Sequence, residues 1–410
     1  MTKRTGEPIE RQEQLPETAD EFRTMLRQIT RRALMSLLEQ EVTQLCGSSH
    51  ARGLEREMFR AGGTQSVLYV EGRREKVRRP RIRRKTATGS EEAALESWKL
   101  ASDPGQWEEA MYHAILCGVS TRNVGSYRME ELSGESRSSL SRLWSRKAAD
   151  LIEQVQQSDL GDFDLVVLMI DAVVLCRDLV ATVALGMDAG GNKRVLGFRI
   201  GSSESAEVCT DLLQGLCRRD LRRENNRSLL VVLDGSKALE KAVTKVFPGT
   251  LVQRCLVHKE RNIKRYLPRR HWPTITAMFN RLRRCQGEEA AKEASDEIAE
   301  FLANKNAQAR ESFEEAGEDL LTVFRLEIPN TLNPTLLSTN AIENAFKNLR
   351  RHIGRVCRWR EETNQADRWV ASGLHLAQKG FRRVRGYQDI GHLIEALKKD
   401  LSIRKGGNAA

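Results

Sequence analysis

The sequence predicts an α/β protein in which a mixed β-sheet is interrupted by an all-helical segment and preceded by a helical region. Three strand-like runs, followed by helix, strand, helix and strand patterns, occupy residues 163–253 and predict the sheet. Residues 259–325 contain no strand-like run and are rich in Ala, Glu, Arg and Leu at helical spacing. A further helix is expected from about Asn340 to Gly354.

The N-terminal part predicts a helix followed by a β-hairpin. Thr18 and Glu21 have the spacing of a capping box, apolar residues then recur at helical spacing, and Gly47 provides a stop. A strand over residues 66–70 would pair with a second strand inside residues 73–85. Residues 85–95 are small and polar and are predicted to be a linker.

Basic charge is concentrated in the second strand of this hairpin. The chain has 67 Lys and Arg against 56 Asp and Glu, a net charge of +11, and residues 73–85 alone hold nine basic residues and one acid. A local surplus of this size favours a polyanionic partner without specifying which one. The basic residues are Arg73, Arg74, Lys76, Arg78, Arg79, Arg81, Arg83, Arg84 and Lys85.

Helical patterns broken by Ser and Gly between residues 105 and 155 have the layout of a helix-turn-helix. Arg137, Ser139 and Arg142 would lie at the start of its second helix, where phosphate and base contacts are usually made. An ordinary helical hairpin explains the same pattern and stays an equal alternative.

Several protein classes are excluded. The apolar run LVVLMI near the centre has six residues, against about 18 needed to span a bilayer, and the polar N-terminus lacks the apolar core of a signal peptide. Eight cysteines without a C-x-x-C pair argue against a disulfide framework and against a four-cysteine zinc site. We therefore expect a cytoplasmic protein with reduced thiols.

Three acids are candidates for metal-dependent chemistry. Asp171 interrupts an apolar strand, Asp234 ends the next core strand, and Glu343 lies in the first turn of the helix that begins near Asn340. If the fold brings them together, they would bind hard cations such as Mg²⁺ through oxygen. Two such ions, roughly 3.5–4 Å apart, support phosphoryl transfer.

Each acid also has a structural interpretation. Asp234 could be a turn residue, and Asp171 could mark a β-bulge. Glu343 could complete a capping box with Asn340 and form an i,i+4 ion pair with Lys347.

Four segments in order, LMIDAVVLCR, VVLDGSKAL, QRCLVHKERNIKRYL and STNAIENAFKNLRR, resemble the Mutator-type transposase family of bacterial insertion sequences. The resemblance covers most of the chain. It implies an RNase H-like catalytic domain with an Asp-Asp-Glu site, interrupted by an all-α insertion before the glutamate. Asp171, Asp234 and Glu343 match the three acids, and the gaps between them are 63 and 109 residues.

Four more residues are candidates for supporting the site. Cys255 and His258 look like the Cys/Asp-x-x-His motif of the family; an incomplete zinc pair, a contact of His258 with the scissile phosphate or with a metal-binding acid, and plain packing all stay open. Lys347 and Arg350 share the helix face of Glu343 and would hold the DNA backbone, or form a solvated basic face. They belong to a second basic set: Lys347, Arg350, Arg351, Arg355, Arg358 and Arg360.

The resemblance implies a DNA transposase that uses two Mg²⁺ or Mn²⁺ ions per active site. It would cut at terminal inverted repeats and join the freed 3′-OH to target DNA, acting in the bacterial cytoplasm at the nucleoid as a dimer or larger assembly. A transposase-derived DNA-binding regulator without activity and an RNase H-like structure-specific nuclease are the alternatives.

The expected domains follow from these assignments. They are a helical region (1–60), a basic β-hairpin arm and linker (61–90), a helix-turn-helix domain (91–158), the first part of the catalytic domain (159–270), the all-α insertion (271–328), and the second part with C-terminal helices (329–410).

Overall fold

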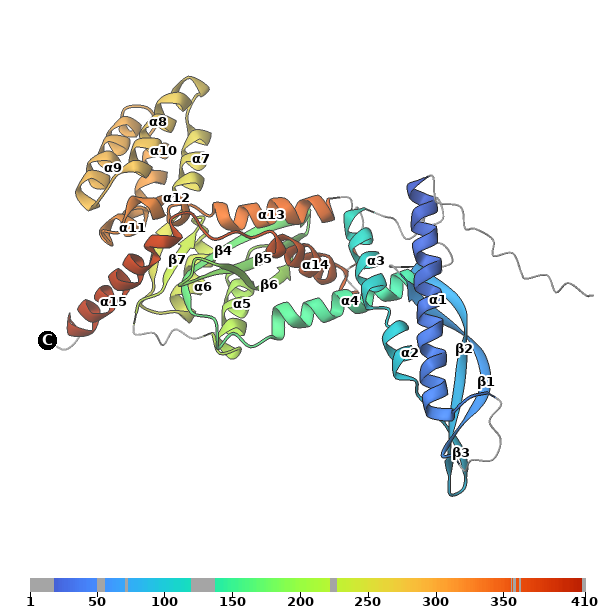
Figure 1. The fold of residues 1–410 in the computed structure, drawn as a ribbon. Helices are drawn as coiled ribbons and strands as arrows, with labels where there is room; N and C mark the ends of the chain where they lie inside the picture. Colours follow the sequence, from blue (N-terminus) through green and yellow to red (C-terminus); the bar gives the residue numbers. More distant parts are fainter. Residues whose placement is uncertain are drawn as a thin grey trace, which may run out of the picture. The chain divides into compact units, whose positions relative to one another are not determined.

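A computed structural model describes residues 18–49, 56–70, 73–118, 137–221, 227–354, 356, 359–360 and 363–407. The chain divides into two compact units, Met1–Trp144 and Ser145–Ala410, and each is considered by itself. Figure 1 shows the ribbon of both units. No helix among the described residues is long and apolar enough to cross a membrane.

The first unit begins with the predicted helix. Helix α1 spans Ala19–Cys46; the Thr18 side chain accepts a hydrogen bond from the Glu21 backbone and the Glu21 side chain accepts one in return, which confirms the capping box. The chain leaves the helix at Gly47, whose φ of 76° favours glycine.

A three-stranded antiparallel sheet follows α1. Strands β1 (Met58–Val70) and β2 (Arg73–Thr86) form the predicted hairpin, although β1 starts eight residues earlier than expected. Leu68, Val70 and Val77 are buried together on this hairpin. The chain then continues into β3 (Gly89–Ala93), which pairs with β2.

The predicted linker over residues 85–95 is therefore wrong. Cross-strand ion pairs explain the difference, because the Glu92 carboxylate on β3 accepts hydrogen bonds from Arg79 at 2.8 Å and from Arg81 at 2.7 Å on β2. Opposite charges on neighbouring strands stabilise a sheet. Composition alone does not indicate this pairing.

Three helices follow the small sheet: α2 (Glu96–Ala101), α3 (Gly105–Cys117) and α4 (Arg137–Gln157). Helices α3 and α4 correspond to the first and last predicted helical stretches. The centre of the predicted helix-turn-helix, residues 119–136, lies outside the described residues. The boundary between the two compact units falls inside α4.

The second unit contains a five-stranded mixed sheet with the order β6-β5-β4-β7-β8. The first three strands along the chain pair antiparallel, and β4–β7 and β7–β8 pair parallel, which confirms the predicted sheet. The strands are β4 (Leu165–Cys176), β5 (Leu179–Asp188), β6 (Lys193–Gly201), β7 (Leu230–Leu233) and β8 (Leu251–Arg254).

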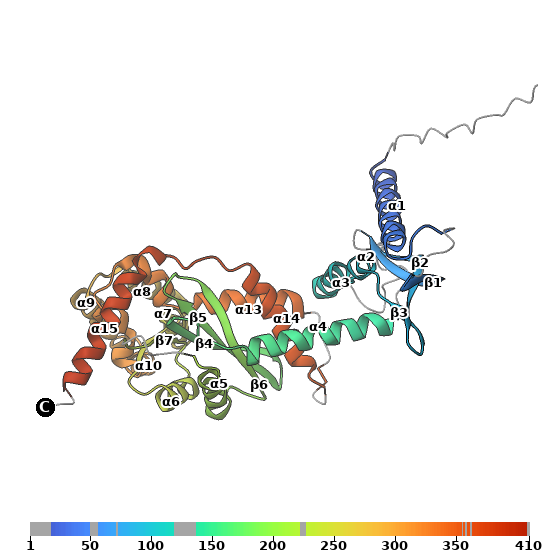
Figure 2. The ribbon, with the colours of Figure 1, turned by 60° about the horizontal axis from the view of Figure 1, so that its bottom comes forward.

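Helices cover both faces of this sheet. Figures 1 and 2 show α5 (Ala206–Arg218) and α6 (Lys237–Val246) on one face, and α13 (Asn340–Ile353) and α14 (Gln365–Lys379) on the other. Leu168 and Ile170 of β4 pack in the cluster under α5 and α6. Because side chains alternate along a strand, Asp171 lies on the opposite face with Met169 and Val173, which belong to the cluster containing α13.

The predicted all-helical segment lies between β8 and α13. Its apolar residues Ile275, Phe279, Ile298 and Phe313 are buried in the same core as α13. The helices are α7 (Leu256–Tyr266), α8 (Trp272–Arg284), α9 (Glu288–Ala303), α10 (Ala307–Glu314), α11 (Thr322–Arg325) and α12 (Asn333–Leu336). Helix α15 (Ile390–Gly407) ends the described chain.

Candidate active site

The parallel pairing of β4 with β7 brings the first two candidate acids side by side. Ile170 pairs with Leu233 at the end of this ladder, and the residue that follows each of them is an acid, Asp171 or Asp234. The register between β4 and β5 is regular at Asp171, which pairs with Val183, so Asp171 does not mark a β-bulge.

Asp171 is a buried carboxylate with little compensation from hydrogen bonds. It is 6% exposed, and its Oδ1 accepts a hydrogen bond from the Ala172 backbone at 2.8 Å. Burial, followed by repulsion from Asp234, raises the pKa of Asp171 to about 7. A divalent cation would remove this penalty, since a buried carboxylate is stabilised by an opposite charge.

Asp234 sits in a tight turn between β7 and α6. Its Oδ1 accepts a hydrogen bond from the Ser236 backbone at 2.9 Å, so the turn interpretation applies to one oxygen of this acid. The turn needs the glycine that follows, because Gly235 has a φ of 106° and a Cβ there would lie 2.7 Å from the Arg254 guanidinium. The charge of Asp234 still acts on Asp171.

Helix α7 begins directly after β8 and carries His258 in its first turn. Cys255 is the N-cap residue, and its buried Sγ accepts a hydrogen bond from the His258 backbone at 3.4 Å. The hydrogen bond with Cys255 is the largest cause that raises the pKa of His258 to about 8, and the charges of Asp171 and Glu343 contribute as well.

Helix α13 carries Glu343 one turn after its N-cap, Thr339. The Glu343 carboxylate faces His258, with Oε1 3.3 Å from Nε2, and Arg261, with Oε2 3.9 Å from Nη2. Among the described contacts of Glu343 there is neither a capping box nor an ion pair with Lys347, so its structural interpretation is wrong.

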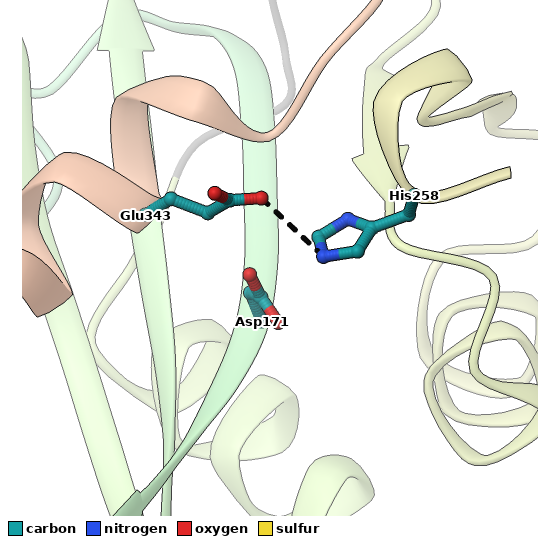
Figure 3. Close-up of side chains that lie close together, drawn as sticks. All are labelled: Asp171, His258 and Glu343. Carbon is teal, nitrogen blue, oxygen red and sulfur yellow. Dashed lines mark ion pairs between the residues drawn. The ribbon is translucent and has the colours of Figure 1, made fainter. Parts of the chain in front are cut away.

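Asp171, His258 and Glu343 form the one group of three or more possible metal ligands in the described part of the chain. A ligand atom from each lies within 4.8 Å of the other two. Figure 3 shows the Glu343 and His258 side chains reaching toward each other beside Asp171. Asp234 and Cys255 are outside this group, so the geometry unites two of the three predicted acids with the predicted histidine.

The donor set fits a divalent cation. Glu343 Oε1 is buried and has no hydrogen-bond partner, because its contact with His258 lacks hydrogen-bond geometry. Two carboxylates suit Mg²⁺ or Mn²⁺, and an imidazole nitrogen is better tolerated by Mn²⁺ than by Mg²⁺. Cys255 is not positioned with His258 and other ligands as a zinc site requires.

An open cavity of about 530 Å³ lies over these residues and is lined mostly by polar side chains. Lys347 and Arg350 line it, together with residues that the sequence analysis did not select for the site, among them Arg261 and Asn344. Arg261 follows His258 by three residues on α7, and this spacing on one helix face was the available signal. The full lining is Asp171, Ala172, His258, Arg261, Asn340, Glu343, Asn344, Phe346, Lys347 and Arg350.

The basic arm of the first unit presents only some of its cations to solvent. Arg79 and Arg81 form ion pairs with Glu92, and Arg83 is half-buried, whereas four other basic side chains of β2 are exposed. The exposed set is Lys76, Arg78, Arg84 and Lys85. The strand positions of Arg73 and Arg74 are described, and their side chains lie outside the described part.

On α4, Arg137 and Arg142 are exposed and Ser139 is half-buried, so both arginines are accessible to a partner. Of the second basic set, Arg351 and Arg360 are also exposed. Arg355 and Arg358 lie outside the described residues.

Carboxylates on neighbouring strands and an adjacent helix, beside a basic cavity, are typical of proteins that act on phosphodiesters with divalent metals. Comparison with known proteins identifies the family. Residues 1–372 match the family described as "Transposase, Mutator family", and the chain belongs to this family.

Individual relatives are similar over parts of their length. The transposase for insertion sequence element IS905 of Lactococcus lactis is 30% identical over 169 residues, 41% of each chain. The transposase for IS256 in transposon Tn4001 of Staphylococcus aureus is 28% identical over 255 residues, 59% of this chain and 63% of the relative. The transposase for ISRM5 of Rhizobium meliloti is 28% identical over 342 residues, 80% of this chain and 81% of the relative. The chain thus matches less than two thirds of the length of the first two relatives.

Proposed function

We propose that this protein is a DNA transposase that cleaves DNA strands at terminal inverted repeats and joins the 3′-OH ends to target DNA. The observation that carries the proposal is the meeting of Asp171, His258 and Glu343 from three distant segments. Membership in the Mutator family and the names of the relatives as insertion sequence transposases support it.

The catalytic part is proposed to be RNase H-like, with Asp171, Asp234 and Glu343 as its three acids. Support comes from the sheet order β6-β5-β4-β7-β8, with three antiparallel strands followed by two parallel additions. The long helical segment between β8 and α13 takes the place of the insertion that the family resemblance implies.

The three acids would hold two Mg²⁺ or Mn²⁺ ions, which lower the pKa of the attacking water or 3′-OH and stabilise the leaving oxygen. Asp234 lies outside the compact group but beside Asp171, so its free oxygen can face the same ion after a side-chain rotation. Arg261, Lys347 and Arg350 line the cavity and would hold the phosphates on either side of the scissile bond.

Recognition of the transposon ends is assigned to the exposed cations of the β2 arm and to Arg137, Ser139 and Arg142 at the start of α4. Lysine and arginine contacts to phosphates position a protein on duplex DNA and make binding salt-dependent. Two ends must be joined, so we propose a dimer or larger assembly on DNA, acting at the bacterial nucleoid.

Strand nicking tests the proposal. Purified protein is incubated with DNA that carries the inverted repeats flanking its gene, in Mg²⁺ or Mn²⁺, and nicks are mapped on sequencing gels. Wild type should nick at the repeat ends, Asp171→Ala should not, and Asp319→Asn, which changes a half-buried acid of the helical segment, should nick like wild type.

Other outcomes favour the alternatives. Binding of the ends without any nick would indicate a DNA-binding regulator. Cleavage of branched or hybrid substrates without preference for the repeats would indicate a structure-specific nuclease. Equal nicking by Asp171→Ala would remove this site from the reaction.

A further inference from the structure

Thr339 joins the two helices that carry His258 and Glu343. It is fully buried and precedes α13 as its N-cap residue. Its carbonyl accepts the backbone hydrogen bond of Glu343 at 3.0 Å, which starts the helix. Its hydroxyl Oγ1 lies 3.1 Å from His258 Nδ1 and 3.5 Å from Cys255 Sγ, both at the start of α7.

Cys255 connects the same place to the sheet. Its backbone N–H donates to the carbonyl of Leu233 at 2.7 Å, immediately before Asp234, and its Sγ accepts the Thr339 N–H at 3.4 Å. The neighbouring Leu256 N–H donates to the Leu337 carbonyl at 3.0 Å. Hydrogen bonds of the buried Cys255 and its neighbour thus connect the end of β7, the start of α7 and the residues before α13.

The direction of these hydrogen bonds depends on which group donates its proton. Two backbone amides point at Cys255 Sγ and can only donate, so the sulfur is an acceptor. The Thr339 hydroxyl has a single proton, which it donates to this sulfur. With its proton used in this way, the hydroxyl accepts from His258 Nδ1, and the imidazole carries a proton on Nδ1 whether it is charged or neutral; a Cys255 thiol that donated its own proton to Thr339 would reverse both bonds.

We propose that Thr339 and Cys255 are positioning residues that hold His258 as the Nδ1–H tautomer, with Nε2 directed at Glu343 and the metal site. This inference rests on the proposed function for its catalytic consequence but not for its geometry. A neutral His258 then presents a lone pair at Nε2 to a metal ion or to a proton of the substrate. A protonated His258 places its positive charge beside the Glu343 carboxylate, or donates from Nε2 to a phosphate oxygen.

Burial alone would raise the pKa of the Cys255 thiol, but the hydrogen bonds from His258 and Thr339 outweigh burial and lower it. This direction agrees with a sulfur that accepts hydrogen bonds. The sequence motif Cys-x-x-His thereby gains a third member 84 residues later in the chain, supplied by the residue before α13.

The tautomer can be measured without DNA or metal. Protein labelled with ¹⁵N-histidine is studied by long-range ¹H–¹⁵N correlation at pH 9, where His258 is mostly neutral, and its signals are identified by their loss in His258→Asn. Wild type and Thr339→Ser should show Nδ1–H, and Thr339→Val should shift toward Nε2–H, the form favoured by the free histidine side chain. A wild-type Nε2–H form, or no change in Thr339→Val, would overturn the proposal.

Nicking of end DNA measures the consequence for the reaction. Thr339→Val should lower the nicking rate by roughly 10–100-fold, the usual effect of losing a hydrogen bond that orients a ligand, and Thr339→Ser should recover most of it. Thr335→Val is the matched control. It removes the buried hydroxyl of an α12 residue, which donates a hydrogen bond to the Arg385 carbonyl. Equal loss in Thr335→Val would show a general packing effect and overturn the positioning role.

The two measurements separate the failures. If wild type nicks no DNA, the proposed function fails and the tautomer measurement still decides the role of Thr339. If wild type nicks normally and Thr339→Val keeps both the tautomer and the rate, the positioning role alone fails.

Discussion

His258 Nε2 lies 3.3 Å from Glu343 Oε1, although the two residues are 85 positions apart in a mostly helical stretch of chain. The helical segment leaves the sheet after β8 and returns at α13, so its two ends bring these side chains together beside Asp171. The histidine thus compensates the carboxylate charge, and a cation would compete for the same oxygen.

Asp171→Asn should change the pH dependence of stability in the presence of a chelator. The pKa of Asp171 in the folded protein, about 7, is above its ordinary value of 3.8. The contribution of this residue to stability is therefore most favourable below pH 4 and is lost as the pH rises through 7. At pH 8 the variant should exceed wild type in free energy of unfolding by roughly 2–4 kcal/mol, since one pKa unit corresponds to about 1.4 kcal/mol. Urea unfolding followed by tryptophan fluorescence at pH 4 to 9 measures this.

The Asp171→Asn variant should keep part of the pH dependence of stability. Because the pKa of His258 is raised, its contribution to the stability of the fold is fully present below pH 6.5 and is lost as the pH rises through about 8. Added Mn²⁺ should remove most of the wild-type disadvantage at pH 8. A wild-type stability that is insensitive to Asp171→Asn at every pH would contradict the buried, uncompensated carboxylate.

Metal affinity should rise with pH across the same range. Protons compete with a cation for Asp171, whose pKa is about 7, and the positive charge of His258 below pH 8 also opposes binding. The dissociation constant for Mn²⁺, measured by calorimetry, should increase at least about tenfold for each unit below pH 7, because each unit reduces the deprotonated fraction of Asp171 tenfold. Asp319→Asn should behave as wild type, whereas Glu343→Gln should bind Mn²⁺ at least about tenfold more weakly. A pH-independent affinity would place the ion elsewhere.

Arg261→Ala should weaken the hold on the substrate phosphate. The Arg261 guanidinium lines the cavity, is half-exposed and lies 3.9 Å from Glu343, so it is free to turn toward a phosphate once a cation binds the carboxylate. We expect nicking at limiting DNA to fall by roughly 10–100-fold, because charge-assisted hydrogen bonds contribute about 1.5–3 kcal/mol. Arg265→Ala removes an exposed cation from the same helix outside the cavity and is the control. Equal losses in the two variants would reduce Arg261 to a part of the general basic surface.

Sequence patterns predicted most of the sheet that positions the site. Short apolar runs and the turn at residues 188–192 specify these strands locally, and the structure confirms them. The parallel ladder then makes Asp171 and Asp234 neighbours, as their positions after matched apolar residues suggested. The position of Glu343 in the first turn of α13 was also predicted.

Contacts between distant segments were not predictable in the same way. The structural interpretation of Glu343 assumed partners on its own helix, whereas its partners His258 and Arg261 come from α7 across the helical segment. Strand β3 was missed because its pairing with β2, which includes ion pairs of Glu92, is not indicated by its small and polar composition. The role of Thr339 depends on a buried thiol 84 residues away, which no local pattern indicates.

Replacing the exposed cations of β2 should reduce the salt dependence of end binding. The variant changes Lys76, Arg78, Arg84 and Lys85 to Gln. These side chains are solvent-exposed, so they can reach phosphates without breaking ion pairs of the small sheet. Each lost phosphate contact should lower the slope of log affinity against log salt by about 0.9, and the loss should be similar for specific and unrelated duplexes. Fluorescence anisotropy between 50 and 300 mM salt, roughly the range in which such slopes are resolved, measures both.

Arg79→Gln with Arg81→Gln is the contrasting variant: it breaks the pairs with Glu92 and should lower the melting temperature of the first unit more than the slope. If the four-residue variant kept the full slope, the DNA contact would lie on α4 or another surface rather than on β2.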